Sequence, residues 1–231
     1  MILNGIDLKV SPGGGSELFQ PSGSPAGWWD ATKITGLEDG DPVGTWSDLS
    51  GNGKDLSQAS AGNKPTYKTD IQNGLPAVLG DGSDDYINKD WTSVDQPNTH
   101  FVAGQFLTLK NSLMADSYST KYQSLGEWDL GGGALFYIHG GTALRGPAGG
   151  ADTDPHVFSA LYNGASSVLR EDGAQIAAGN ANTQQRRGFQ LFADFGESAP
   201  AHCYVFEAVI YDSSEDAAAN ESALMAKWGI S

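Results

Sequence analysis

Short apolar runs separated by turn-forming residues dominate this 231-residue chain. Between residues 27 and 86 the runs contain three tryptophans, and none of them has the 3.6-residue period of an amphipathic helix. Two longer runs, at 99–109 and 202–211, have apolar residues at both parities, which is typical of strands covered on both faces. The pattern predicts an all-β sandwich and argues against a βαβ nucleotide-binding unit.

Strands are expected wherever a β-rich run lies between turn signals. The expected strands are 28–31, 43–46, 77–79, 86–88, 99–109, 134–139, 156–162, 167–170, 175–178, 188–193 and 202–211. Glu171-Asp172-Gly173 separates two of them and has the Asp-Gly pair of a tight hairpin. Two glycine-rich stretches, 126–133 and 140–154, are expected to be loops, and the longer one is a candidate functional loop.

One helix is expected, at the C-terminus. Ser213 opens an S-S-E-D capping box that ends at Asp216. Leu224 and Trp228 fall on one face of the following turns, and Gly229 ends the pattern. This helix is expected to lay its apolar face against the sandwich.

The first 26 residues differ in composition from the rest. Residues 1–10 alternate as a half-buried strand does, and a Pro-, Gly- and Ser-rich linker follows. We therefore expect an arm and linker at 1–26 and a globular domain at 27–231. The arm either adds a strand to another chain or docks on its own domain, and its apolar positions are Ile2, Ile6, Leu8 and Val10.

Charge and composition exclude some classes of binding partner. With 28 acidic and 13 basic residues the formal net charge is −15, which argues against binding nucleic acid or an anionic membrane. The chain begins without a basic and apolar secretory signal and has no apolar run of about 18 residues. The single cysteine, Cys203, is expected to be a buried small hydrophobe.

Several motifs in a fixed order resemble a known domain. They are WWDA at 28–31, VGTWSDLSGNGKD at 43–55, KPTYKTDIQNGLPAVLGDGSDDYI at 64–87, EAVIYD at 207–212 and AKWG at 226–229. Together they resemble a concanavalin A-like (laminin G-like) jelly-roll domain of the type found in bacteriophage structural proteins. The resemblance implies two curved antiparallel sheets in a family that mostly binds glycans or builds structures, with a minority of glycosidases and lyases. Where the pattern has an aromatic residue before Asp81-Gly82, this chain has Gly80.

Catalytic motifs are weak. Glu127-Trp128-Asp129 has two carboxylates at strand spacing but lacks the third carboxylate of the jelly-roll glucanase motif. Glu207, alone in an apolar strand, is expected to pair with Arg170, Arg186 or Arg187. The four histidines are scattered, so neither a nucleophilic triad nor a zinc spacing is apparent. These observations predict that the chain is not an enzyme.

Two candidate binding sites remain. Asp81, Asp84 and Asp85 share one turn and could hold calcium, the alternative being a polar turn and no cofactor. Glycan binding uses aromatic faces beside polar groups. The candidate residues for it are Trp91, Tyr118, Tyr122, Trp128, Asp129 and Tyr137.

The family that the chain resembles is typical of extracellular surfaces, yet the sequence shows no export signal. A virion protein would explain both features, because it is made in the host cytoplasm and released by lysis. We therefore expect a capsid decoration or tail-fibre component that associates with itself or other virion proteins through its arm and displays a lectin-like domain. The alternatives are an extracellular carbohydrate-binding module of a secreted bacterial protein or, less well supported, a glycoside hydrolase or lyase.

Overall fold

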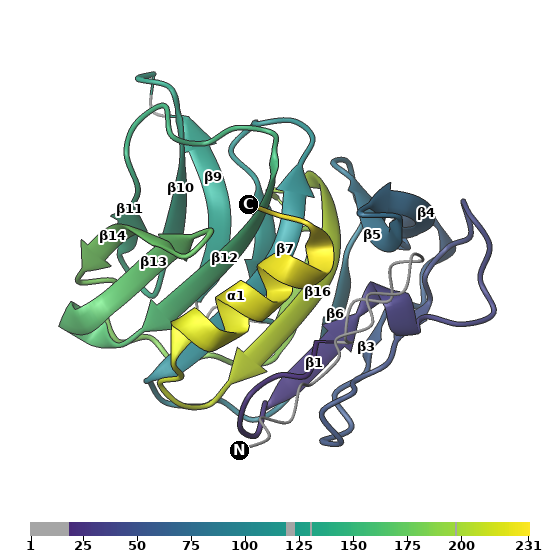
Figure 1. Cartoon of the computed structure of the whole chain (residues 1–231), viewed down its shortest axis with the longest axis horizontal. Helices are drawn as coiled ribbons and strands as arrows, with labels where there is room; N and C mark the ends of the chain where they lie inside the picture. Colours follow the sequence, from purple (N-terminus) through teal and green to yellow (C-terminus); the bar gives the residue numbers. More distant parts are fainter. Residues whose placement is uncertain (1–18, 119–122, 130, 197) are drawn as a thin grey trace, which may run out of the picture.

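The computed structural model describes residues 19–118, 123–129, 131–196 and 198–231. Two antiparallel sheets stack face to face, and one helix lies on the outside of one of them (Figure 1). This is the two-layer β-sandwich with a C-terminal helix that the sequence predicts. Within the described residues, no helix is both long and apolar enough to cross a membrane.

Sheet A has the strand order β14-β13-β12-β7-β16-β5-β4, with β1 also paired to β16. Its strands are β1 Gly27–Asp30, β4 Thr66–Gln72, β5 Leu75–Asp81, β7 Asn98–Phe106, β12 Pro155–Tyr162, β13 Ser167–Glu171, β14 Ala174–Gly179 and β16 His202–Tyr211. Sheet B has the order β11-β10-β9-β8-β15-β6-β3-β2. Its strands are β2 Thr45–Trp46, β3 Leu56–Ser57, β6 Ile87–Lys89, β8 Leu113–Asp116, β9 Ser124–Asp129, β10 Ala134–His139, β11 Ala143–Arg145 and β15 Phe189–Leu191. Short 3-10 turns occupy Ala31–Lys33, Ala61–Asn63 and Gly164–Ser166.

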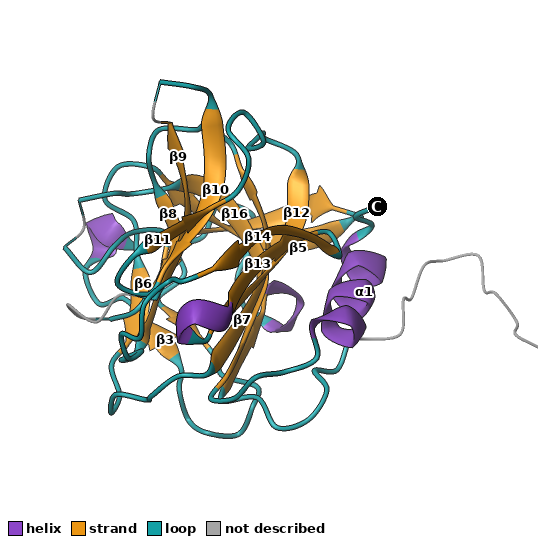
Figure 2. Cartoon of the chain, turned by 90° about the vertical axis from the view of Figure 1, so that its left-hand side faces the viewer, coloured by secondary structure: helices purple, strands orange, loops and turns teal. Residues whose placement is uncertain are grey.

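The two strands with apolar residues at both parities, β7 and β16, are neighbours at the centre of sheet A. One face of this pair meets sheet B, and the other is covered by helix α1, Ala217–Trp228 (Figure 2). Leu224 and Trp228 are fully buried there, and the Trp228 ring stacks on Phe206 at 5.1 Å. The expected cap is wrong: Asp216 is the N-cap, and its carboxylate accepts from the Ala218 amide.

The core between the sheets is built on aromatic side chains. The rings of Trp29 and Phe189 stack across it at 5.1 Å, and those of Phe106 and Phe136 at 5.9 Å. Cys203 is completely buried in the same core, as expected for a small hydrophobe. Each of these large rings contributes roughly 2–3 kcal/mol of burial free energy, so this interface supplies much of the stability of the sandwich.

Residues 19–26, the described part of the segment 1–26, pack on the chain's own domain. The Phe19 ring is buried edge-on against Trp28 at 6.3 Å. The Ser22 amide donates to Asn220 on α1, and the Ser22 carbonyl accepts from the Tyr211 hydroxyl. The predicted assembly residues Ile2, Ile6, Leu8 and Val10 lie outside the described residues.

The stretch 126–133 is not a loop throughout, because strand β9 runs through its first half. Gly126 occupies the centre of β9, where a Cβ would lie 2.4 Å from the Ser112 carbonyl oxygen. The glycine is therefore needed for the close approach of β8 rather than for flexibility. The glycine content of this stretch concealed a strand.

Position 80, where an aromatic residue was expected, is a glycine, and the ring of Phe192 lies against it. A Cβ on Gly80 would lie 2.6–2.8 Å from atoms of the Phe192 side chain. Phe192 is fully buried and has a φ of 76°, an unusual value for a bulky residue. A ring from the loop after β15 thus occupies the volume that a side chain at position 80 would take.

We expect Gly80→Ala to lower the free energy of unfolding by about 1–3 kcal/mol, because the added methyl group overpacks the core against Phe192. Urea denaturation followed by tryptophan fluorescence measures this change. The variant Gly62→Ala is the matched control, since a Cβ there meets nothing within 4 Å and its φ is not left-handed. Gly62→Ala should change the free energy of unfolding little, so a cost at Gly80 no greater than at Gly62 would contradict the packing argument.

Candidate functional site

A row of polar side chains crosses the outer face of sheet B. The strand registers place Ser57 opposite Asn88, Asn88 opposite Gln190, and Gln190 opposite Asp116. The Asn88 amide donates to Gln190 Oε1 at 3.1 Å, and Gln190 Nε2 donates to the Ala193 and Asp194 carbonyls. Four strands from separate parts of the chain thus present hydrogen-bonding groups on a common face.

The row leads into a hollow of about 410 Å³ over strands β8, β9 and β10. Apolar side chains form part of its wall, and acidic, imidazole and hydroxyl groups are mixed among them. The lining residues are Asn111, Leu113, Asp116, Ser124, Glu127, Trp128, Tyr137, His139, Asp194 and Ala199. A concave, mixed surface of this size is typical of a small-molecule site.

Asp116 is the most perturbed acid of the hollow. Its side chain is completely buried, and it accepts from the amides of Ser117 at 2.7 Å and Phe195 at 3.4 Å. Burial raises the pKa of Asp116 to about 8, and repulsion from the Asp194 carboxylate acts in the same direction. At neutral pH the group is therefore mainly a neutral carboxylic acid that can donate a hydrogen bond.

Asp194 and His139 complete the polar lining. The Asp194 carboxylate accepts from the Ser198 amide, the Ser198 hydroxyl and the Ala199 amide, which fixes the loop after β15. Burial, followed by the nearby Arg145 charge, lowers the pKa of His139. A neutral imidazole, a neutral acid and a fixed carboxylate can together exchange hydrogen bonds with a polyol.

Exposed aromatic rings flank the hollow. Trp128 is 36% exposed, although its ring lies 5.8 Å from Tyr137 and 5.8 Å from the Arg145 guanidinium. Phe195 follows Asp194 and is 41% exposed, with Tyr118 edge-on to it at 5.2 Å. These are the two large apolar side chains found exposed within the described part of the chain.

The predicted glycan-binding residues have different locations. Trp128 and Tyr137 line the hollow, and Tyr118 packs on Phe195 beside it. Asp129 is exposed outside the lining and accepts from the Gly131 amide at 2.7 Å. Trp91 lies elsewhere, with the Lys54 and Arg186 cations 4.6 and 5.2 Å from its ring, and Tyr122 is outside the described residues.

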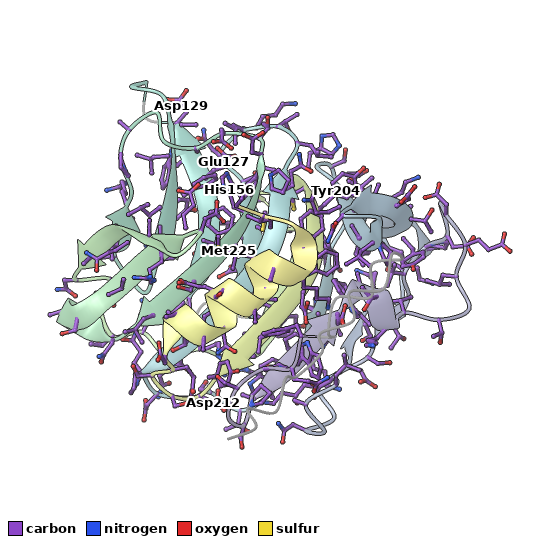
Figure 3. The ribbon with its side chains drawn as sticks, viewed as in Figure 1. Glu127, Asp129, His156, Tyr204, Asp212 and Met225 are labelled. Carbon is purple, nitrogen blue, oxygen red and sulfur yellow. The ribbon has the colours of Figure 1, made fainter. Side chains whose placement is uncertain are left out.

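Glu127 and Asp129 lie at the C-terminal end of β9 (Figure 3). Glu127 is fully buried and belongs to the lining of the hollow, whereas Asp129 does not. Its Oε1 accepts from the Lys110 amide and from the amide and hydroxyl of Ser112, at 2.7–2.9 Å. The carboxylate therefore anchors the loop before β8, and the two acids do not form a pair facing the hollow.

The acidic turn at Asp81, Asp84 and Asp85 brings three carboxylates within 4.8 Å of one another. Asp81 accepts from the Ser83 amide at 2.8 Å, and Asp85 accepts from the Asp81 amide at 3.1 Å. Burial, followed by repulsion from Asp81, raises the pKa of Asp85 to about 7. Calcium binding by this turn stays a prediction.

The sequence interpretation missed Asp116, His139 and Asp194. Asp116 ends the apolar run Leu113–Asp116, which was not expected to be a strand. His139 had a readable signal, because it alternates with Leu135 and Tyr137 along one face of an expected strand. Asp194 enters the site only through the fold of the loop after β15.

No family model matches the sequence, and no curated protein resembles it in sequence. Solved structures resemble its fold. A Trypanosoma rangeli sialidase in complex with sialic acid superposes with a TM-score of 0.59 at 12% identity, over 91% of this chain and 34% of the sialidase. Domain 4 of AbnA, a GH43 extracellular arabinanase from Geobacillus stearothermophilus in complex with arabinotriose, gives 0.56 at 13% identity, over 81% of this chain and 99% of the domain.

A GH54 α-L-arabinofuranosidase gives a TM-score of 0.62 at 12% identity, over 81% of this chain and 51% of that enzyme. The chain thus spans about a third of the sialidase length. At these identities the likeness establishes the β-sandwich fold, and the neighbours are carbohydrate-active proteins. The prediction that the chain is not an enzyme is contradicted by these neighbours, which are glycoside hydrolases or a domain of one.

Proposed function

We propose that this chain is a carbohydrate-binding β-sandwich that holds saccharide in the hollow on the outer face of sheet B. The observation that carries the proposal is the exposed Trp128 ring at the edge of a hollow containing Asp116, His139 and Asp194. An indole face stacks on the C–H face of a sugar, while acid, imidazole and carboxylate groups bond its hydroxyls. The complex with arabinotriose of one fold neighbour, an arabinanase domain matched over 99% of its length, supports this chemistry.

Trp128→Ala is expected to weaken oligosaccharide binding by about 5- to 100-fold, since a stacked aromatic ring contributes on the order of 1–3 kcal/mol. Isothermal titration calorimetry with arabino- and other neutral oligosaccharides, chosen after a glycan-array screen, measures the affinity. Tyr204→Ala is the matched control, because Tyr204 is a partly buried ring on sheet A, away from the hollow (Figure 3). Equal affinity of both variants for the glycan, with both folded, would refute the proposed site.

Hydrolysis is the second candidate function, and the burial of Asp116 beside Asp194, which raises the pKa of Asp116 to about 8, is the feature that favours it. A glycosidase needs an acid that keeps its proton near neutral pH and a second carboxylate nearby. Asp116 meets the first condition, and Asp194 is close enough to raise its pKa. Release of reducing sugar that is lost in Asp116→Asn, while binding persists, would establish hydrolysis.

The fold neighbours give no support to virion assembly. The fold neighbours named above are not phage proteins, and the arm that would attach the domain lies outside the described residues. Capsid or tail attachment and self-association therefore remain predictions, as does virion or extracellular location.

A further inference from the structure

We propose that the ligand of the hollow is an extended oligosaccharide, which stacks on Trp128 at one end and on Phe195 at the other. The inference rests on the proposed function, because it concerns the same face of sheet B. It goes further in two respects. It assigns Phe195 a binding role, and it selects a stretch of several linked sugars, rather than one terminal sugar, as the class of ligand.

Two exposed rings on the edges of one hollow are the first observation. Among the described residues, Trp128 and Phe195 are the large apolar side chains that are exposed, at 36% and 41%. Single exposed apolar residues scattered over a surface are ordinary and need no explanation. Here both belong to one hollow, since Trp128 lines it and Phe195 follows the lining residue Asp194. A phenyl ring also has no polar group that exposure would hydrate, so a stacking partner is the simplest reason for its position.

The strand register sets the separation of the two rings. Trp128 and Ser124 share one face of β9 and are four residues apart, which corresponds to about 13 Å along the strand. Ala115 pairs with Leu125, so the next residue, Asp116, lies beside Ser124. The Phe195 amide lies 3.4 Å from the Asp116 carboxyl group, which places Phe195 at the Ser124 end of the hollow. A single sugar ring is shorter than this separation, so contact with both aromatic rings requires several linked units.

The loop that carries Phe195 is held on the outer face of sheet B. The Asp194 carbonyl accepts from Gln190 Nε2, and the Asp194 carboxylate accepts from the amide and hydroxyl of Ser198. The ring of Tyr118, which follows β8, supports Phe195 edge-on at 5.2 Å. The ring is therefore presented in one position before any ligand arrives, which lowers the entropy cost of binding.

Hydrogen-bonding groups lie between the rings. The register brings His139 opposite Ser124, and Asp116 lies on the other side of Ser124. These three residues of β10, β9 and β8 all line the hollow. A sugar chain that runs along β9 from Trp128 to Phe195 would pass over them, so its middle units could exchange hydrogen bonds while its end units stack.

The test is calorimetric titration of the full chain with linear arabino-oligosaccharides from the disaccharide to the hexasaccharide, or with the same lengths of the glycan that the array selects. Affinity is expected to rise with length until the sugar chain reaches Phe195 and then to level off. Phe195→Ala should weaken binding of the hexasaccharide about 2- to 10-fold more than binding of the disaccharide. Trp128→Ala should weaken binding at every length.

Phe195→Tyr is the matched control, because it keeps the aromatic face and should keep the dependence on length. Phe195 is 41% exposed, so both variants should fold, which thermal unfolding checks. Equal affinity for the disaccharide and the hexasaccharide would overturn the inference and leave the Trp128 site standing. A loss in Phe195→Ala that is the same at every length would also overturn it, since the ring would then only support Asp116.

Two other outcomes identify a different error. Light scattering that shows a dimer, dissociated by Phe195→Ala, would assign the ring to a second copy of the chain and overturn the inference. Absence of binding at every length would refute the proposed function itself, and the inference with it.

Discussion

Replacing Lys227 with methionine is expected to lower the free energy of unfolding by about 3–5 kcal/mol. The Lys227 ammonium on α1 lies 2.8 Å from Asp30 Oδ2 and 2.7 Å from Glu207 Oε2, and all three side chains are at most 2% exposed. Methionine fills a similar volume but leaves two uncompensated carboxylates in the protein interior. The helix would lose its electrostatic contact with sheet A.

The indoles of Trp28 and Trp228 also donate to Glu207, at 2.6 and 3.0 Å, so the cluster is well satisfied only while the cation is present. Urea denaturation at pH 7 measures the change, with the exposed Lys33→Met as control. Adding Glu207→Gln to Lys227→Met should recover part of the loss, because the amide removes one charge and keeps an acceptor for the indoles. A Lys227→Met cost equal to that of Lys33→Met would show that the cluster contributes nothing.

The sequence predicted sheet A better than sheet B, and the reason is the kind of burial in each. Strands β7 and β16 are covered on both faces, so their apolar runs are long and recognisable. Strands β8 and β9 are short and carry their hydrogen-bonding groups on one face, with a register shift between them at Leu113 and Ala115. A bulge of this kind breaks the two-residue period on which strand prediction depends.

Buried polar contacts were the least predictable feature. Glu207 was expected to pair with Arg170, Arg186 or Arg187, but its partner is Lys227. Arg170 instead pairs with Glu221, Arg186 with Asp212 and Arg187 with Asp90. Charge composition indicates that partners are needed, but only the packing of α1 on sheet A determines which residue supplies them.

The hollow illustrates the same limit. Aromatic residues in loop-rich segments pointed to Trp128 and Tyr137, because rings near turns are commonly displayed. Asp116 gave no signal, since its raised pKa depends on burial and on Asp194, and the pairing of β8 with β15 creates this environment. Strand order and register bring these groups together, and neither can be read from local spacing.

Asp116→Asn is expected to make the chain more stable at pH 8 while changing its stability little near pH 4. The pKa of Asp116 is about 8 in the folded chain and about 4 in an unfolded one. Between these values the folded state holds a proton that the unfolded state has released, so the contribution of Asp116 to stability falls as pH rises from about 4 to about 8. Above pH 8 Asp116 is ionised in both states, so the cost of its buried charge to the free energy of unfolding stays at its full value.

Since each pKa unit corresponds to about 1.4 kcal/mol, the stability gained by Asp116→Asn should grow by about 5 kcal/mol between pH 4 and pH 8. Urea titrations of the unmodified chain and of Asp116→Asn across this range measure the difference between their free energies of unfolding. Asp85 and Glu207 also have raised pKa values, but their contributions to the pH dependence cancel because both proteins contain them. Asp129→Asn, which removes an exposed carboxylate of the same sheet, is the control. If Asp116→Asn had the same pH dependence as the unmodified chain, Asp116 would be ionised like a surface acid. It could not then serve as the proton donor that either sugar binding or hydrolysis assigns to it.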